Sequence, residues 1–129
     1  MLNKENLYLA ADFIERLPMG KFDMELYRED ESNSITCNTV GCALGHLTGL
    51  FPDLVTFTRD GDINFWELPY TMFGITSDRV EAYCFASEWH KIDNTARGCA
   101  ARLRFLADNG EEATVQKWKE TCKAHNLIL

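Results

Sequence analysis

Apolar and polar residues alternate along most of this chain with the period of an α-helix. In the N-terminal segment, one apolar face is formed by five residues at helical spacing: Leu7, Ala10, Ala11, Ile14 and Leu17. Because residues three or four positions apart share a helix face, this pattern predicts a helix from about Asn3 to Leu17. Pro18 and Gly20 follow directly and end the helix.

The same spacing predicts three more helices in the second half of the chain. Helix-capping hydroxyl side chains and an Asn-Gly stop signal set their limits. We expect the helices at these positions: 76–89 with Thr76 or Ser77 as cap, 95–109 with Thr95 as cap and Asn109-Gly110 as stop, and 111–125. Their apolar stripes include Cys84, Cys99 and Cys122, so these three cysteines are predicted to belong to the core.

Between residues 55 and 66 the period changes from helical to strand-like. Two short β-prone runs, Val55–Thr58 and Ile63–Trp66, flank an Asp-Gly turn signal, which predicts a small β-hairpin. The ELPYTMFG stretch at 67–74 is expected to be a loop. The fold class that follows is mainly α: one globular domain over 1–129, with about five helices and one small hairpin.

A glycine stripe marks the most apolar helix, TVGCALGHLTGLF at 39–51. Gly41, Gly45 and Gly49 recur every four residues, although each glycine inside a helix costs about 1 kcal/mol relative to alanine. Missing side chains on one face let another backbone or a ligand approach closely. We therefore predict that this helix is central and buried, and that His46 has a hydrogen-bond partner in the core.

Composition and charge narrow the classes of function. The chain has 129 residues, 46% hydrophobic residues and a formal net charge of −7. The negative charge disfavours direct nucleic-acid binding, and no apolar run is long enough for a membrane span. The N-terminus lacks the apolar block of a secretion signal, and the five cysteines lack the spacing of a disulfide framework, so a cytoplasmic location is expected.

One candidate site is metal-binding. Cys42 and His46 lie one helical turn apart, and Cys37 stands just before the same helix, so the three side chains could share one zinc ion. His90 or Cys84 would have to complete the ligand set. The chain has no pair of closely spaced cysteines typical of zinc modules, and a hydrogen-bonded core histidine is the simpler interpretation. We expect neither a metal nor another cofactor.

A second candidate is a nucleophilic site. Cys37 lies near a helix N-terminus, which favours the thiolate. His46 or His90 could act as the base, with Asp93 orienting His90, as in Cys-His hydrolases and transferases. The local sequence signatures of the familiar cysteine hydrolases are absent.

A third candidate is a binding surface. Trp66, Tyr70, Trp89 and His90 fall at predicted loops or helix ends, where aromatic residues line ligand pockets or anchor interfaces. The alternative is that they cover a small core. Both interpretations fit the sequence equally well.

Four parts of the sequence form a recognisable combination: a Cys-x-Thr-x-x-Cys-x-x-Gly-His block at 37–46, the Phe22 and Met24 pair, Phe73-Gly74-Ile75 before Glu81-Ala82, and the alanine-rich stretch 96–106. In these parts the chain resembles a family of small, uncharacterised proteins of bacteriophages, prophages and bacteria. Asn38 stands where the family has glycine. The resemblance implies a phage-type accessory role and brings no activity, cofactor or catalytic residue with it.

These observations favour a non-enzymatic accessory binding protein that acts on a host factor or a small ligand, with antagonism of a host defence as one concrete form. A protein or small-molecule partner is expected. The alternatives are a Cys-His hydrolase or transferase that uses Cys37, and a small structural zinc domain.

Overall fold

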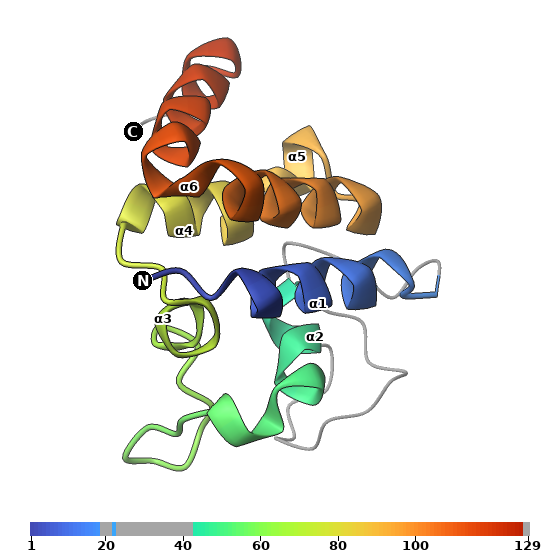
Figure 1. The fold of residues 1–129 in the computed structure, drawn as a ribbon, viewed down its shortest axis with the longest axis vertical. Coiled ribbons are helices and arrows are strands. Elements are labelled where there is room, and N and C mark those ends of the chain that lie inside the picture. Colours follow the sequence, from blue (N-terminus) through green and yellow to red (C-terminus); the bar gives the residue numbers. More distant parts are fainter. Residues whose placement is uncertain (19–21, 23–42, 128–129) are drawn as a thin grey trace.

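A computed structural model describes residues 1–18, 22 and 43–127, and this part of the chain is mainly helical (Figure 1). The elements follow one another along the chain as α1 Lys4–Glu15, α2 Ala43–Leu50, the short 3₁₀ helix η1 Pro52–Leu54, α3 Leu68–Phe73, α4 Asp78–Phe85, α5 Trp89–Ile92 and α6 Ala96–Ala124. None of the described helices combines the length and the apolar character that a membrane crossing requires.

Helix α1 forms where the apolar stripe predicts it. The Asn3 side chain caps its start by accepting a hydrogen bond from the backbone N–H of Asn6 at 3.0 Å. The predicted inward face is buried, and α1 lies between the first part of α6 and helices α2 and α3 (Figure 1). The Asn3 N–H also donates to the carbonyl of Phe73 at 2.8 Å, which fixes the chain start against the end of α3.

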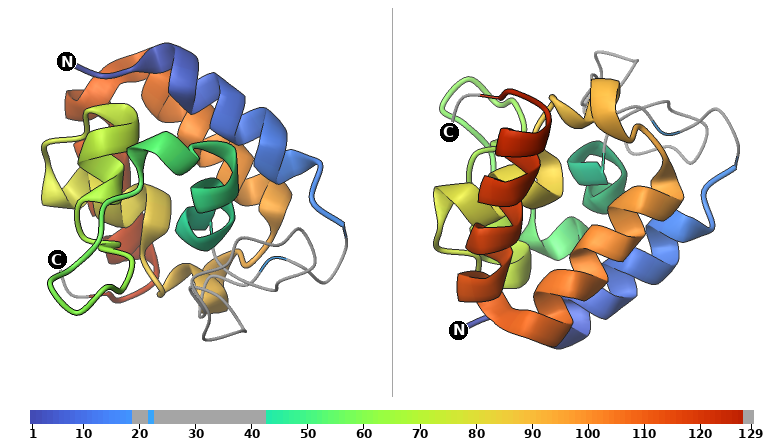
Figure 2. Two further views of the ribbon diagram at one scale, coloured as in Figure 1. Left: turned by 90° about the horizontal axis from the view of Figure 1, so that it is seen from below. Right: turned by 90° about the horizontal axis from the view of Figure 1, so that it is seen from above.

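Helix α2 is an interior helix, as predicted for the described part of the glycine-striped segment. Every residue from Ala43 to Thr48 is buried, including His46. Figure 2 shows α2 surrounded by α1, α6 and the segments around α3 and α4. Gly49, in contrast, is exposed, so burial of the stripe is confirmed at Gly45 and does not extend to Gly49. The first stripe glycine, Gly41, and the expected cap, Thr39, lie outside the described residues.

Gly110 divides α6 into two arms that point in different directions (Figure 1). Its backbone angles, φ 87° and ψ 174°, belong to a region that is essentially restricted to glycine. The predicted helix end at Asn109-Gly110 is therefore present as a sharp change of direction. The carboxylate of the next residue, Glu111, accepts hydrogen bonds from the Thr76 N–H at 2.9 Å and the Ser77 N–H at 3.2 Å, which joins the bend to the start of α4.

Two predictions between the helices need correction. The segment 67–74, predicted as a loop, contains α3, because Leu68, Met72 and Phe73 bury an apolar face there. Gly74 ends α3 in a left-handed conformation with φ 71°. The helix predicted to reach Trp89 ends at Phe85, because the backbone at Ala86 is extended, and Trp89 instead begins the short helix α5.

The predicted hairpin is present as a turn but not as two strands. Within the described residues no β-strand forms, and the segment holds one isolated antiparallel bridge between Phe57 and Ile63. The Thr58 N–H donates to the carbonyl of Asp62 at 2.7 Å, across the turn that contains Gly61. The hairpin thus remains unconfirmed as a pair of strands.

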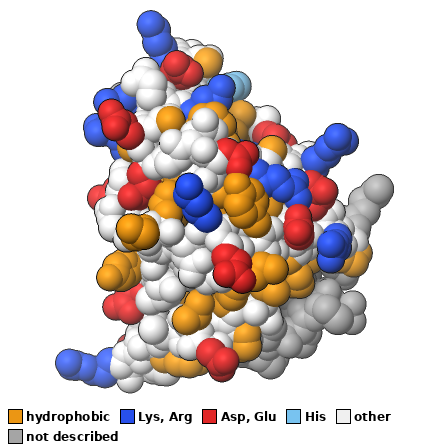
Figure 3. All heavy atoms as spheres, in the orientation of Figure 1, with side chains coloured by type: hydrophobic (Ala, Val, Ile, Leu, Met, Phe, Trp, Pro, Cys, Tyr) orange, Lys and Arg blue, Asp and Glu red, His pale blue; other side chains and the backbone are white. Residues whose placement is uncertain are grey.

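The core lies where α1, α4 and the first arm of α6 meet. Cys84, Cys99 and Cys122 are buried in this core, as predicted from their helix stripes. Burial raises the pKa of the Cys84 thiol well above its usual range, so this side chain behaves as a small neutral apolar group. On the face drawn in Figure 3, hydrophobic side chains lie scattered among residues of both charges.

Candidate functional site

The cysteine-centred sites predicted from the sequence involve Cys37, Cys42 and His46. Cys37 and Cys42 lie outside the described residues, and His46 is buried within α2. Among the residues that the structure describes, no group of three histidine, cysteine or acidic side chains is arranged to hold a metal ion. The zinc site and the Cys37 nucleophile therefore stay predictions.

Trp89, a predicted binding residue, lies in the core with 6% of its surface exposed. Its ring centroid is 5.9 Å from that of Tyr83 and 5.8 Å from that of Trp118. The indole N–H donates a hydrogen bond to the carbonyl of Ala82 at 3.2 Å. The ring faces and the polar atom of Trp89 are thus used inside the molecule, and we assign Trp89 to the core.

Arg102 places a buried positive charge directly on this tryptophan. Its guanidinium carbon lies 3.8 Å from the centre of the Trp89 ring, in the geometry of a cation–π interaction. Its Nη1 atom lies 3.8 Å from Oδ2 of Asp93. We call Trp89, Asp93 and Arg102 the buried trio, after its buried tryptophan and arginine; the Asp93 side chain is 40% exposed.

Two further nitrogens of Arg102, Nε and Nη2, are buried and donate to no hydrogen-bond acceptor among the described residues. Arg102 was not predicted from the sequence as a residue of interest. Its signal was available, because Arg102 occupies an inward position between Cys99 and Leu103 on the apolar stripe of α6. A charge at such a position predicts a partner in the core.

Asp93 was predicted to orient the His90 ring. The hydrogen bonds described for these two side chains are made with different residues. Asp93 accepts from the Thr95 hydroxyl at 2.6 Å and from the Thr95 N–H at 3.2 Å, which secures the start of α6. The Nδ1 atom of His90 lies 3.1 Å from the side-chain nitrogen of Asn94. These contacts give Asp93 a role in holding α6 and Arg102.

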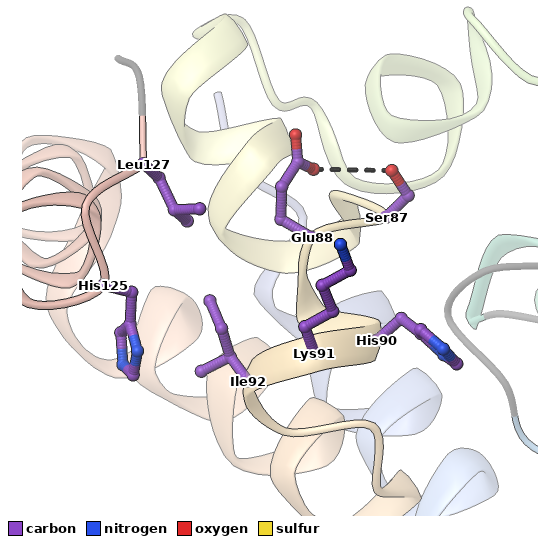
Figure 4. A pocket seen from close by; sticks show the side chains of 7 residues that line it. All are labelled: Ser87, Glu88, His90, Lys91, Ile92, His125 and Leu127. Carbon is purple, nitrogen blue, oxygen red and sulfur yellow. Dashed lines mark hydrogen bonds between the residues drawn. The ribbon is translucent and has the colours of Figure 1, made fainter.

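His90 belongs instead to a pocket of about 450 Å³ beside α5 and the end of α6 (Figure 4). The pocket is lined by Ser87, Glu88, His90, Lys91, Ile92, His125 and Leu127. Figure 4 shows His90 turned away from His125, on the opposite side of α5. The Ser87 hydroxyl donates to Glu88 at 3.4 Å. The described lining carries side chains of both charges.

The other two predicted binding residues, Trp66 and Tyr70, stand on the surface. Trp66 is 84% exposed and Tyr70 is 62% exposed, and Phe57 on the preceding segment is 58% exposed. We call Phe57, Trp66 and Tyr70 the aromatic corner. The segment 55–66, which carries Phe57 and Trp66, lies at the opposite end of the molecule from the second arm of α6, and Tyr70 lies on α3 (Figure 1).

Hydrogen bonds hold the two segments of the aromatic corner together. The Thr56 hydroxyl donates to the carboxylate of Glu67 at 3.2 Å. Thr56 directly precedes Phe57 in the chain, and Glu67 directly follows Trp66. The Thr71 hydroxyl donates to the carbonyl of Leu54 at 3.2 Å, beside Tyr70. The three exposed rings are therefore carried by connected backbone segments and not by independent loops.

The part of the sequence that carries Phe57 and Trp66 is rich in acidic residues. Between residues 53 and 67 there are four exposed carboxylates and one arginine, a net charge of −3: Asp53, Asp60, Asp62 and Glu67 against Arg59. Within the described part of the chain, the ion pairs involve Arg102 and Arg104 and none of these four carboxylates. The segment therefore presents aromatic rings together with uncompensated negative charge.

No protein-family model, curated protein or solved structure matches this chain significantly. The resemblance to small phage and prophage proteins thus rests on its motif residues alone. Most of the 37–46 block that carries it lies outside the described residues.

Proposed function

We propose that this protein is a non-enzymatic accessory binding protein of phage or prophage type that acts on a host protein in the cytoplasm. The single observation that carries the proposal is the exposure of Trp66, with exposed Tyr70 four residues later in the sequence. Antagonism of a host defence is the concrete form that we favour, since the resemblance implies an accessory role.

The physical argument starts from the three tryptophans of the chain. Trp89 and Trp118 are 6% and 5% exposed, so their burial stabilises the fold, whereas Trp66 is 84% exposed and contributes little to it. Burying a large apolar side chain is worth about 1.5–3 kcal/mol. That free energy remains available at Trp66 for a binding event, and tryptophan and tyrosine are the residues that most often dominate interfaces.

The position of these rings favours a protein over a small ligand. Small molecules bind in concave sites that bury most of their surface. The aromatic corner stands at a turn and at the start of α3, and none of its three residues lines the pocket beside α5. An exposed aromatic group of this kind suits the flatter surface of another protein.

Affinity purification from bacterial lysate tests the proposal, with native mass spectrometry of the eluted complex. We expect the wild-type protein to retain a stoichiometric partner and the Trp66→Ala/Tyr70→Ala variant to lose it. Leu9→Ala is the matched control, because Leu9 is also a large exposed hydrophobic residue, at 47% exposure, but lies on α1. A clean monomer from the wild type, or equal retention by all variants, would overturn the proposal.

Thiol labelling with iodoacetamide across pH separates this proposal from the Cys37 hydrolase or transferase. Buried Cys84, whose pKa is raised by burial, is expected to react only when the protein unfolds. A single thiol that reacts with an apparent pKa well below about 8.5 would favour the enzymatic alternative. Uniformly slow labelling of the folded protein would support a binding function.

A further inference from the structure

The molecule contains one tryptophan that already binds an arginine. In the buried trio, the guanidinium of Arg102 lies 3.8 Å from the centre of the Trp89 ring and the Asp93 carboxylate lies 3.8 Å from the same guanidinium. Arginine is suited to this arrangement because its planar group stacks on an aromatic face while its N–H groups point outward to a carboxylate. The ring and the carboxylate thus bind opposite parts of one cation.

Trp66 is an exposed ring in an acidic segment of the chain, and no described cation lies over it. Its ring is exposed, Glu67 is its neighbour in the chain, and Asp60 and Asp62 lie in the preceding turn. Within the described residues, cations lie over Trp89 and Phe105, and none lies over Trp66. The charge of −3 over residues 53–67 attracts a positively charged group to this ring.

We propose that the aromatic corner binds an arginine-bearing segment of a partner protein, with the guanidinium on Trp66 and the negative charge supplied by the acidic segment 53–67. This inference rests on the proposed binding function and names the chemistry of the partner. Phe57 and Tyr70 add exposed apolar surface on the connected backbone segments, and Asp60, Asp62 and Glu67 add negative charge.

Charge argues against the other occupants. A second copy of this chain would bring another net charge of −7 to an acidic surface, and nucleic acid would bring phosphates. A lysine would be attracted by the same charge, but its compact ammonium is more strongly hydrated and lacks the planar face that stacks on a ring. The partner residue expected at Trp66 is therefore arginine.

The test is a titration with defined peptides, followed by fluorescence anisotropy of a fluorescein label. The probes are a short peptide of alternating arginine and glycine and the matched lysine-glycine and glutamate-glycine peptides. We expect the arginine peptide to bind most tightly, the lysine peptide more weakly and the glutamate peptide not at all. Binding should weaken as the salt concentration rises, because exposed charges are screened.

Variants then separate the aromatic corner from the overall acidity of the chain. Trp66→Ala should weaken binding of the arginine peptide by about tenfold, the range expected when a cation–π contact and its apolar area are lost. Asp60→Asn/Asp62→Asn should weaken it by about threefold, since each exposed ion pair contributes little. The control is Glu112→Gln/Glu120→Gln, which removes the same charge from two exposed positions on the second arm of α6 and should leave binding unchanged.

Each of the other outcomes overturns the inference. Equal loss in the aspartate variant and in the α6 control would mean unspecific attraction to an acidic protein. Tight binding of free arginine amide, equal to that of the peptide, would indicate a small-molecule site instead of a protein segment. A concentration-dependent shift of tryptophan emission without peptide, absent from the Trp66→Ala variant, would mean that a second copy covers the corner.

The lysate experiment keeps the two proposals apart. If the arginine peptide fails to bind while the lysate still yields a partner that depends on Trp66, the arginine inference is wrong and the binding function stands. If neither experiment shows binding, both proposals are wrong.

Discussion

The aromatic corner and the buried trio are two regions in which the same residue types reach opposite outcomes. Trp89 is 6% exposed, with Arg102 on its ring and Asp93 beside the guanidinium, whereas Trp66 is 84% exposed in an acidic segment and has no described cation on its ring. In the first region the fold itself supplies the contacts of the tryptophan. In the second region the fold leaves most of the ring exposed to solvent. The comparison teaches that the stability of the fold accounts for Trp89 but not for Trp66.

The largest effect should come from Trp89→Ala. Removing a buried tryptophan that contacts Tyr83, Trp118 and Arg102 leaves a cavity and strands the guanidinium, so we expect a loss of about 3–5 kcal/mol in the free energy of unfolding. Urea denaturation measures it. A loss below about 1 kcal/mol would break the comparison, because Trp89 would then contribute as little as a surface residue.

A smaller effect is expected from Gly98→Ala, which disturbs the buried trio through Asp93. A Cβ atom at Gly98 would collide with the Asp93 carboxylate, which accepts hydrogen bonds from Thr95 and faces Arg102. Moving that carboxylate should lower the free energy of unfolding by about 1–2 kcal/mol, despite the better helix propensity of alanine. Arg97→Ala, at the neighbouring exposed position, is the control and should change stability little. Equal melting temperatures for the two variants would contradict the collision.

Arg102→Met tests how much the positive charge of Arg102 contributes to the free energy of unfolding. Two nitrogens of Arg102 are buried without a hydrogen-bond partner among the described residues, so removing the charge also removes a desolvation cost. Asp93 is not stranded by the change, because its side chain is 40% exposed and remains hydrated. We expect the free energy of unfolding to change by less than about 1 kcal/mol, whereas Arg102→Ala should cost more because it leaves a cavity. Chemical denaturation of both variants checks the difference, and a large loss in the methionine variant would mean that the cation itself stabilises the core.

The smallest effect on stability should come from Trp66→Ala. With 84% of its surface exposed, Trp66 contributes little to folding, and the free energy of unfolding should change by no more than about 0.5 kcal/mol. The same variant should lose the partner in the affinity purification. A tryptophan that matters for binding and not for stability is the result that the comparison predicts, and a substantial loss of stability would contradict it.

Helix positions were the part of the fold most readily predicted. The stripe of Leu7, Ala10, Ala11 and Ile14 placed α1, and Asn109-Gly110 placed the bend in α6, because spacing and capping are local properties. The prediction was wrong for α3, where burial of Leu68, Met72 and Phe73 overrides loop-like residues. It was also wrong for the end of the helix before Trp89. In both places contacts between distant segments decide the backbone.

The sequence indicated which aromatic residues to consider as candidates, but not which of them are exposed and which are buried. Trp66, Tyr70, Trp89 and His90 were equivalent in the sequence, since all four stand near predicted loops or helix ends. The structure separates them into two exposed rings, one core ring and one pocket residue. Arg102 was overlooked although its inward position on the apolar stripe of α6 indicated a partner in the core. Which residues are its partners is shown only by the structure.

The sequence by itself determined the helical character of the chain, its acidity, the burial of Cys84, Cys99 and Cys122, and the presence of more aromatic residues than a small core requires. These properties depend on composition and on spacing within single helices. Only the tertiary structure decided which tryptophan packs in the core and which faces water, because that choice depends on segments distant in the chain. Trp89 is enclosed by Arg102 and Trp118 of α6, and no corresponding segment of the described chain covers Trp66.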